Sequence, residues 1–257
     1  MLNTVARAFE VLSLFTSNHP LWGASSVAAR MALPKSVAHD LLRTLWELGM
    51  LERHVGGQYG LGLALLPLAH QVQASRPWLA ASRREMVALA GLSGEVIHLS
   101  VLQQGALLHL EDAHPVGAGK DLGLPSPGLA SMNIPPQCSA MGKVLLSALP
   151  LGEVQAMMAR QGLPALTESS IRTADELQTE LARIREQGYA YDVEEAFPGV
   201  CCIAVPVRAG GQVRAAISMS SPAERFYAHK REHRAQLLEA VGRLEAGLTV
   251  LALQGDA

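Results

Sequence analysis

The chain has 257 residues, of which 49% are hydrophobic and 17% are charged, and this length and composition suffice to bury the cores of two domains. Its formal net charge of −2 excludes the strongly basic class of proteins that coat nucleic acid, so any DNA binding has to be local. Three cysteines are too few for a disulfide-built fold, and since no run of about eighteen apolar residues and no signal-peptide pattern occurs, we expect a cytoplasmic protein with no membrane partner.

The chain begins with two short helical patterns. Apolar residues, Phe9 among them, recur at spacings of three and four over residues 6–15, which predicts a first helix that packs through them. Ser25 and Ser26 precede an apolar stretch at residues 27–31, and serine oxygens are common N-terminal helix caps. We therefore predict a second, short helix capped by these serines.

The stretch at residues 33–51 contains a longer amphipathic helix. Pro34 presets the φ angle of a helical first turn, an apolar stripe runs from Val37 to Leu48, and Gly49 is a natural stop. The face opposite this stripe is polar and basic, with Lys35, Ser36, His39, Arg43 and Thr44. Two helices joined by a tight turn, with such groups near the start of the second, predict a helix-turn-helix whose second helix reads DNA.

The next segment predicts a β-hairpin. Two short strands within residues 51–61 flank Gly56-Gly57, the arrangement called a wing. Arg53 and His54 lie on this wing, where we expect backbone or minor-groove contacts with DNA. The order of three helices and a hairpin predicts a winged helix-turn-helix domain over residues 1–62.

Residues 63–76 predict a linker helix. The stretch is apolar on nearly all faces before it turns polar, which is typical of a helix buried against a partner or the next domain. Pro67 predicts a kink or a late start. A break at residues 75–77 marks the boundary to a second domain, residues 77–257.

In this second domain the hydrophobic period changes from helical to alternating. Residues 96–101 and 106–110 flank a Gln-Gln-Gly turn and predict a hairpin. We interpret His98 and His109 as sheet residues with hydrogen-bond partners, while a metal held by two histidines on paired strands stays open. A loop rich in Gly, Pro and Ser follows at residues 117–136 and is expected to close a ligand site.

The rest of the chain mixes helices and strands. Small residues at 138–142 lead into a helix whose first amides can hold an anion. Thr173 and Glu176 form a capping box, and strands are expected at 189–193, 202–207 and 215–220. The second domain is therefore predicted to be α+β, an antiparallel sheet flanked by helices.

Sequence motifs in both domains resemble the IclR family of bacterial transcription regulators over essentially the whole chain. In the first domain the resemblance rests on LPKSVAHDLLRTLWELGMLER and QYGLG. In the second it rests on CSAMGKVLLS, IREQGYAYDVEEAFPGVCCIAVPV and AAISMSSP. The resemblance implies a winged DNA-binding domain joined by a linker helix to a GAF-like effector domain, assembled as dimers or dimers of dimers. It also implies a repressor or activator whose operator binding changes with a small effector, often an organic acid.

The resemblance also implies functional residues. On the DNA side it covers Lys35, Ser36 and His39. The polar face of the helix adds Arg43, the wing adds Arg53 and His54, and the short helix adds Ser25 and Ser26. For the effector site it covers Ser139, Ala140, Met141, Asp192, Cys202, Ser218 and Ser220, with Cys138 and Gly142 from the same turn. Because one domain carries few cations and several acids, we expect a homo-oligomer, dimer or tetramer, on a palindromic double-stranded operator.

Three positions depart from the family pattern. Val37 replaces a usual threonine and Asp40 a usual arginine, so either Asp40 points away from DNA or it lowers affinity. Cys201 stands where many relatives carry arginine, which weakens the case for a simple carboxylate effector.

Two alternatives to an effector-controlled regulator concern the cysteines. The first is a thiol enzyme that uses Cys138, Cys201 or Cys202 with a histidine or Asp192 as base, but no spacing fixes such a base. The second is a metal or redox sensor on the same thiols, although no CxxC pair is present. We therefore expect a regulator and no enzyme, with no required cofactor and no metal among the site residues.

Overall fold

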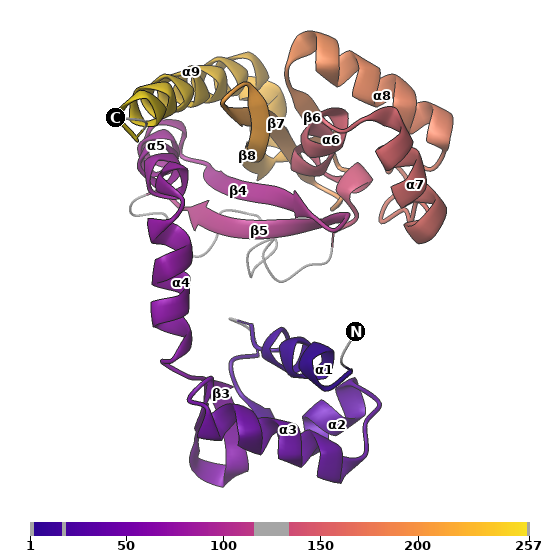
Figure 1. Ribbon diagram of the computed structural model, residues 1–257. Coiled ribbons are helices and arrows are strands. Elements are labelled where there is room, and N and C mark those ends of the chain that lie inside the picture. Colours follow the sequence, from indigo (N-terminus) through magenta and orange to yellow (C-terminus); the bar gives the residue numbers. More distant parts are fainter. Residues whose placement is uncertain (1–2, 17–18, 116–133, 256–257) are drawn as a thin grey trace. The chain divides into compact units, whose positions relative to one another are not determined.

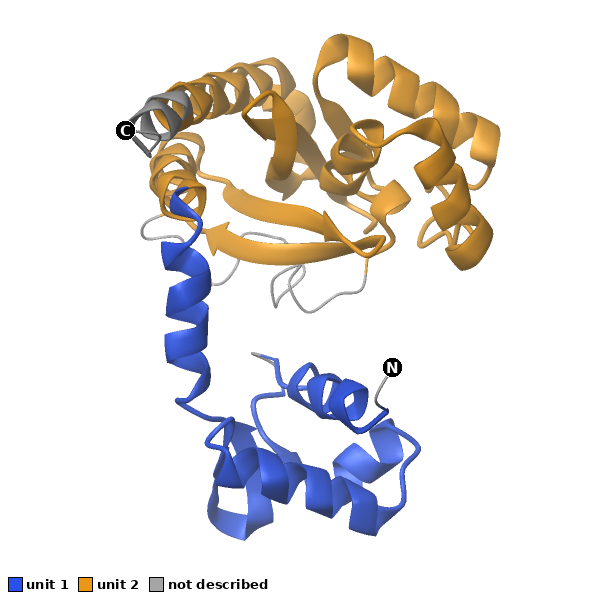
Figure 2. Cartoon of the chain, viewed as in Figure 1, with its two compact units in different colours: residues 1–77 blue, residues 78–257 orange. Residues whose placement is uncertain are grey.

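The computed structural model describes residues 3–16, 19–115 and 134–255. The chain divides into two compact units, an N-terminal unit of residues 1–77 and a C-terminal unit of residues 78–257 (Figure 2). Over the described ranges, none of the helices is both long enough and apolar enough to cross a membrane.

The N-terminal unit consists of helices and a small three-stranded sheet of order β1-β3-β2, with both strand pairs antiparallel. Its elements are α1 (Asn3–Leu12), β1 (Trp22–Gly23), α2 (Ala24–Arg30), α3 (Lys35–Glu47), β2 (Leu51–Arg53), the 3₁₀ turn η1 (Val55–Gly57), β3 (Gln58–Leu61) and α4 (Leu65–Ala74) (Figure 1). The predicted winged helix-turn-helix is present. The strand β1 was not predicted, because two residues are too short to show a period.

Helix α3 packs into the unit through Ala38, Leu41, Leu42 and Leu45, all buried. The predicted stripe is wrong at Leu48, which is 62% exposed, because the helix ends at Glu47 and Leu48 is already its C-terminal cap. The stop at Gly49 is confirmed by its φ of +73°, a conformation that glycine adopts without strain.

Helices α1 and α4 depart from the predictions at their apolar faces. Helix α1 buries Val11, while Phe9, expected on its packing face, is exposed. Helix α4 starts late, as one alternative for Pro67 predicted, and none of its ten residues is buried within the chain. Apolar side chains therefore remain exposed along α4, among them Leu66, Leu68 and Val72.

The C-terminal unit is built on an antiparallel sheet of order β5-β4-β8-β7-β6, which confirms the predicted α+β class. Its elements are α5 (Pro77–Ser93), β4 (Val96–Gln103), β5 (Ala106–Ala113), the 3₁₀ turn η3 (Pro136–Cys138), α6 (Ala140–Ser147), α7 (Leu151–Gln161), α8 (Ala174–Gln187), β6 (Ala190–Val193), β7 (Val200–Ala209), β8 (Gln212–Pro222) and α9 (Ala223–Gly255) (Figure 1).

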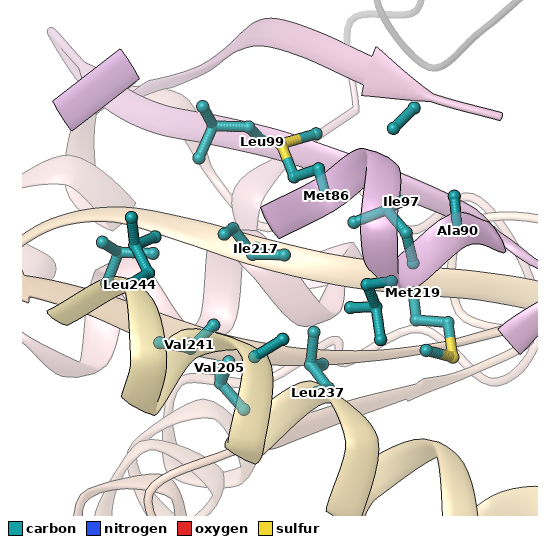
Figure 3. Packing of buried hydrophobic residues seen from close by; sticks show 14 of the residues in the cluster. Met86, Ala90, Ile97, Leu99, Val205, Ile217, Met219, Leu237, Val241 and Leu244 are labelled. Carbon is teal, nitrogen blue, oxygen red and sulfur yellow. The ribbon is translucent and has the colours of Figure 1, made fainter. Parts of the chain in front are cut away.

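The two faces of this sheet bury different helices, because successive side chains of a strand point to opposite faces. On one face, side chains of α5 and α9 pack with the strands, as Met86 and Leu237 do around Ile217 (Figure 3). On the other face, α6 and α8 pack on a second cluster that includes Cys202 and Ala216. The central strands β4, β8 and β7 are therefore covered on both sides, and polar residues on the α6 face are buried.

Candidate DNA interface and ligand pocket

The exposed face of α3 carries the side chains predicted to read DNA. Lys35, Ser36, His39 and Arg43 are all exposed, as expected for residues opposite a buried helical stripe. In the free protein, Arg43 Nε donates a hydrogen bond to Glu47 Oε1 at 2.8 Å, one helical turn away. Arg43 therefore has to leave this partner, or share it, to reach a phosphate.

Asp40 lies on the same exposed face of α3. It is four residues after Ser36 and three before Arg43, and such spacings bring side chains together on one helix face. Its Oδ1 is 3.9 Å from His39 Nδ1, and its side chain is 79% exposed. Asp40 therefore does not point away from the face that carries Ser36 and Arg43. This leaves the second alternative, that Asp40 lowers the affinity for DNA.

Ser25 and Ser26 do not cap a helix, which corrects the predicted role. Helix α2 begins at Ala24 with Gly23 as its N-terminal cap, and no side chain fills the cap. The helix thus starts three residues earlier than predicted. Both serines lie in its first turn, and both are exposed.

The wing, residues 51–61, presents one cation and one histidine. Arg53 is exposed on β2, and His54 Nε2 lies 3.0 Å from Glu52 Oε1. The turn is made by Gly56 and Gly57, whose φ angles are +80° and +74°. Val55 at the tip is 98% exposed; this apolar tip was not singled out in the sequence.

In the C-terminal unit, a pocket opens on the α6 face of the sheet. It encloses about 540 Å³ of space free of protein atoms, part of it open to solvent. Of the residues predicted for the effector site, it is lined by Ser139, Ala140, Met141, Asp192, Cys202 and Ser218. Side chains that the sequence had not indicated also line it: Ser100, Leu107, His109, Ile134, Ala196, Phe197 and Val200. We call this set the ligand pocket.

The three other predicted residues have different surroundings. The Cys138 thiol donates to the Pro164 carbonyl oxygen at 3.4 Å. Ser220 does not line the pocket, but its Oγ lies 3.0 Å from Sγ of Cys202, which does. Gly142 packs closely against the turn before α6, since a Cβ there would lie 2.1 Å from the Pro136 carbonyl oxygen.

Serines contribute differently to the pocket wall. Ser139 Oγ accepts a hydrogen bond from the Gly142 amide at 3.0 Å and so caps α6. Ser218 Oγ is buried and has no hydrogen-bond partner. An unpaired buried hydroxyl is costly, so Ser218 is the polar group of this wall that a ligand would satisfy.

A buried group of charges lies beside the pocket. Asp192 on β6 is 2% exposed, and its Oδ1 accepts a hydrogen bond from the Glu195 amide at 2.7 Å. Burial, reinforced by the negative charge of Glu195, raises the pKa of Asp192 to about 7. Lys143 forms a close ion pair with Glu195, and its Nζ also lies 3.8 Å from Glu180 Oε1. Asp192 thus exchanges its proton near neutral pH.

The three cysteines are poor nucleophiles in these surroundings. Burial raises the pKa of the Cys138 thiol, raises that of Cys201 to about 11, and raises that of Cys202 well above its ordinary value. Since the thiolate is the reactive and metal-binding form, the thiol-enzyme and thiol-sensor alternatives are not favoured. The loop at residues 117–136, expected to close the pocket, falls mostly outside the described residues; of it, Ile134 lines the pocket.

Two family models match the chain. The model described as IclR helix-turn-helix domain matches residues 4–54, and the model described as bacterial transcriptional regulator IclR C-terminal matches residues 70–244. The chain is 30% identical to the HTH-type transcriptional regulator XynR of Escherichia coli over 223 residues, covering 86% of each protein. It is 32% identical to the glycerol operon regulatory protein of Streptomyces coelicolor over 217 residues, 80% of this chain and 79% of that protein.

The alignments with solved structures extend over both units. An IclR homologue from Microbacterium hydrocarbonoxydans, crystallised in complex with 4-hydroxybenzoate, aligns with a TM-score of 0.82 at 26% identity, covering 96% of this chain and all of that one. An IclR regulator from Alicyclobacillus acidocaldarius aligns with a TM-score of 0.83 at 24% identity, covering 96% and 98%.

Proposed function

The chain belongs to the IclR family of bacterial transcriptional regulators, and from that premise we propose that it binds a palindromic operator as a homo-oligomer and that a small organic acid in the ligand pocket changes this binding. As a family member with a helix-turn-helix domain, the chain is a DNA-binding transcriptional regulator. The residues, the oligomer and the effector are the proposed parts.

On the DNA side, α3 is the reading helix. Ser36 and His39 would contact base edges, while Lys35 and Arg43 would contact phosphates, because the first turns of a recognition helix enter the major groove. Ser25 and Ser26, in the first turn of α2, would donate to a phosphate where that helix crosses the backbone. Arg53 and His54 on the wing would add contacts that do not depend on sequence.

The charges of the N-terminal unit support a second copy of the chain. The exposed face of α3 carries Asp40 and Glu47 beside its cations, so one unit offers few net phosphate contacts. Two units on a palindrome double them. The exposed apolar side chains of α4 support an oligomer as well, since contiguous apolar surface commonly marks an interface.

The observation that carries the effector proposal is the unpaired Ser218 Oγ in a pocket that also contains Asp192. A protonated Asp192 donates a hydrogen bond to a ligand carboxylate without repelling it. Ala140 and Met141, the first residues of α6, have amides without partners inside the helix and line the same pocket. Leu107, Phe197 and Val200 supply an apolar wall, which favours an acid with a hydrophobic body.

The DNA-binding part is tested with fluorescence anisotropy on operators selected from a random pool. We expect Lys35→Ala to weaken binding and to flatten its salt dependence, while Arg84→Ala on α5, an equal loss of charge in the other unit, leaves both unchanged. Equal behaviour of the two variants would contradict the role of Lys35.

The effector part is tested with 4-hydroxybenzoate, benzoate and succinate as probes. We expect at least one of them to raise the thermal midpoint of the full chain and to shift its affinity for the selected operator. Ser218→Ala should reduce the shift, whereas Ser221→Ala should not, because Ser221 is an equally buried serine of β8 that does not line the pocket. An acid that shifts DNA binding of wild type and of the Ser218 variant equally would place the effector elsewhere.

A further inference from the structure

Two histidines and one aspartate meet at the β4–β5 edge of the C-terminal sheet. One donor atom from each of His98, His109 and Asp112 lies within 4.8 Å of the others. His98 Nδ1 and Asp112 Oδ1 are in close hydrogen-bond contact, and His109 Nε2 is 2.8 Å from the same oxygen. Two imidazoles thus converge on one carboxylate.

A β-bulge creates this convergence. His98 and Ser100 are two apart on β4 and so point to one face of the sheet, and their cross-strand partners are Asp112 and His109. In a regular strand, residues three apart point to opposite faces. The register shift at Leu99/Ser100 places an extra residue in β5, which brings His109 and Asp112 to the same face. Bulges often re-aim side chains in this way at functional sites.

The cluster is not satisfied by protein groups alone. The ion pairs of Asp112 in the described chain are with the two histidines, and its side chain is 19% exposed. His109 Nε2 is buried near Asp112 but is not aligned for a hydrogen bond with it, so this cluster nitrogen has no hydrogen-bond partner. A carboxylate that is largely shielded from water is normally paired with a cation or coordinates a metal.

We propose that His98, His109 and Asp112 bind a divalent first-row transition metal ion of the zinc class. Two imidazole nitrogens and one carboxylate oxygen suit Zn²⁺, Co²⁺ or Ni²⁺, whereas Mg²⁺ and Ca²⁺ take oxygen ligands. Bonds of about 2.0–2.2 Å around a tetrahedral ion put ligand atoms about 3.4 Å apart. The donor atoms here all lie within 4.8 Å of one another, and both imidazole nitrogens are closer than about 3.4 Å to Asp112 Oδ1, so rotations of these side chains would have to open a space for the ion.

The site leaves one position free and touches the ligand pocket. Three protein ligands on a tetrahedral ion leave the fourth for water or another oxygen. Ser100 Oγ lies 3.4 Å from His109 Nδ1, as an outer group that orients the ring does in metal sites. His109 also lines the ligand pocket, so an ion on His109 would fix part of the pocket wall.

The test measures Zn²⁺ and Co²⁺ binding to the full chain, free of affinity tag and stripped with EDTA, with neither DNA nor acid present. Its failure therefore leaves the proposed regulation untouched. We expect one ion per chain by calorimetry. Loss of an outer-shell group lowers metal affinity by roughly 10–100-fold, and His109→Ala and Asp112→Asn should each lower it by more than this. His114 is an exposed neighbouring histidine, and His114→Ala should bind the ion as wild type does.

Three results would overturn the site. These are no binding to wild type at micromolar ion, equal binding by all four proteins, or a cobalt spectrum with a thiolate charge-transfer band, which would assign the ion to cysteine. Circular dichroism and urea unfolding of each variant show whether it is folded. In addition, Zn²⁺ should raise the thermal midpoint of wild type and His114→Ala but not that of Asp112→Asn.

Discussion

Replacing Asp192 with asparagine should change how the stability of the C-terminal unit depends on pH. The pKa of this buried acid is raised from an ordinary 3.8 to about 7 by burial and by the charge of Glu195. Between these values the unfolded chain has released its proton while the folded chain retains it. Folding is then penalised, and the penalty grows as pH rises and is complete above pH 7.

The size of this effect follows from linkage. Each unit of pKa shift corresponds to 1.36 kcal/mol, so the wild-type penalty is about 1.5 kcal/mol at pH 5 and about 4 kcal/mol at pH 8. Asparagine has no charge to lose, and its oxygen still accepts the hydrogen bond that the Glu195 amide gives to Asp192 Oδ1. The stability of Asp192→Asn relative to wild type should therefore increase by about 2.5 kcal/mol from pH 5 to pH 8.

The assay is urea unfolding of the full chain, followed by circular dichroism between pH 5 and pH 8. The difference between variant and wild type reports on the C-terminal unit, because the substitution lies there. Glu168→Gln, which neutralises an exposed acid, is the control and should show almost no such trend. A difference for Asp192→Asn that stays constant with pH would refute the raised pKa and with it the protonated partner for a carboxylate ligand.

Other substitutions test the packing and the DNA-facing charges. Gly142→Ala should destabilise the chain by about 1–3 kcal/mol, because its Cβ would lie 2.1 Å from the Pro136 carbonyl oxygen. Gly152→Ala, whose Cβ would have no neighbour within 4 Å, should stabilise α7 by about 0.5–1 kcal/mol. Thermal unfolding that ranks the two variants otherwise would contradict the close approach at Gly142. Asp40→Asn should strengthen DNA binding, most at low salt, and anisotropy that shows weaker binding would mean that Asp40 orders the reading helix instead. Arg53→Ala should weaken operator and unrelated DNA by the same factor and lower the salt slope by about 0.9 for each bound copy of the chain. A change in the ratio of the two affinities would make Arg53 a sequence reader.

The sequence predicted those parts of the fold whose causes are local. The stop of α3 at Gly49 and the hairpin turn at Gly56-Gly57 were readable because glycine takes positive φ angles at little cost. The burial of Leu48 and Phe9 was not predicted correctly, because helical spacing indicates a face but not where the helix ends or what covers it. The buried positions Leu41, Leu42 and Leu45 follow the spacing because they lie well inside the helix.

The pocket was predictable only in part. Asp192, Cys202 and Ser218 came from the resemblance to a family, since alternation within one strand does not say which strands are neighbours. Ser100 and His109 were missed as pocket residues. Ser100 and His109 pair directly across the hairpin, but the alternation of these two strands does not say which of their faces carries a pocket.

One strand register connects the pocket to the histidine cluster. Across the sheet, Ala204 on β7 lies opposite Ser218 on β8, Ser218 opposite His98 on β4, and His98 opposite Asp112 on β5. The unpaired hydroxyl of the pocket and the proposed metal ligands therefore belong to one cross-strand row. A slip of one residue in any of these strands would move that strand's member of the row to the face of α5 and α9, where the side chains are apolar. The pairing that buries the core thus also positions both sites, so a substitution that shifts β8 is expected to disturb ligand and metal binding together.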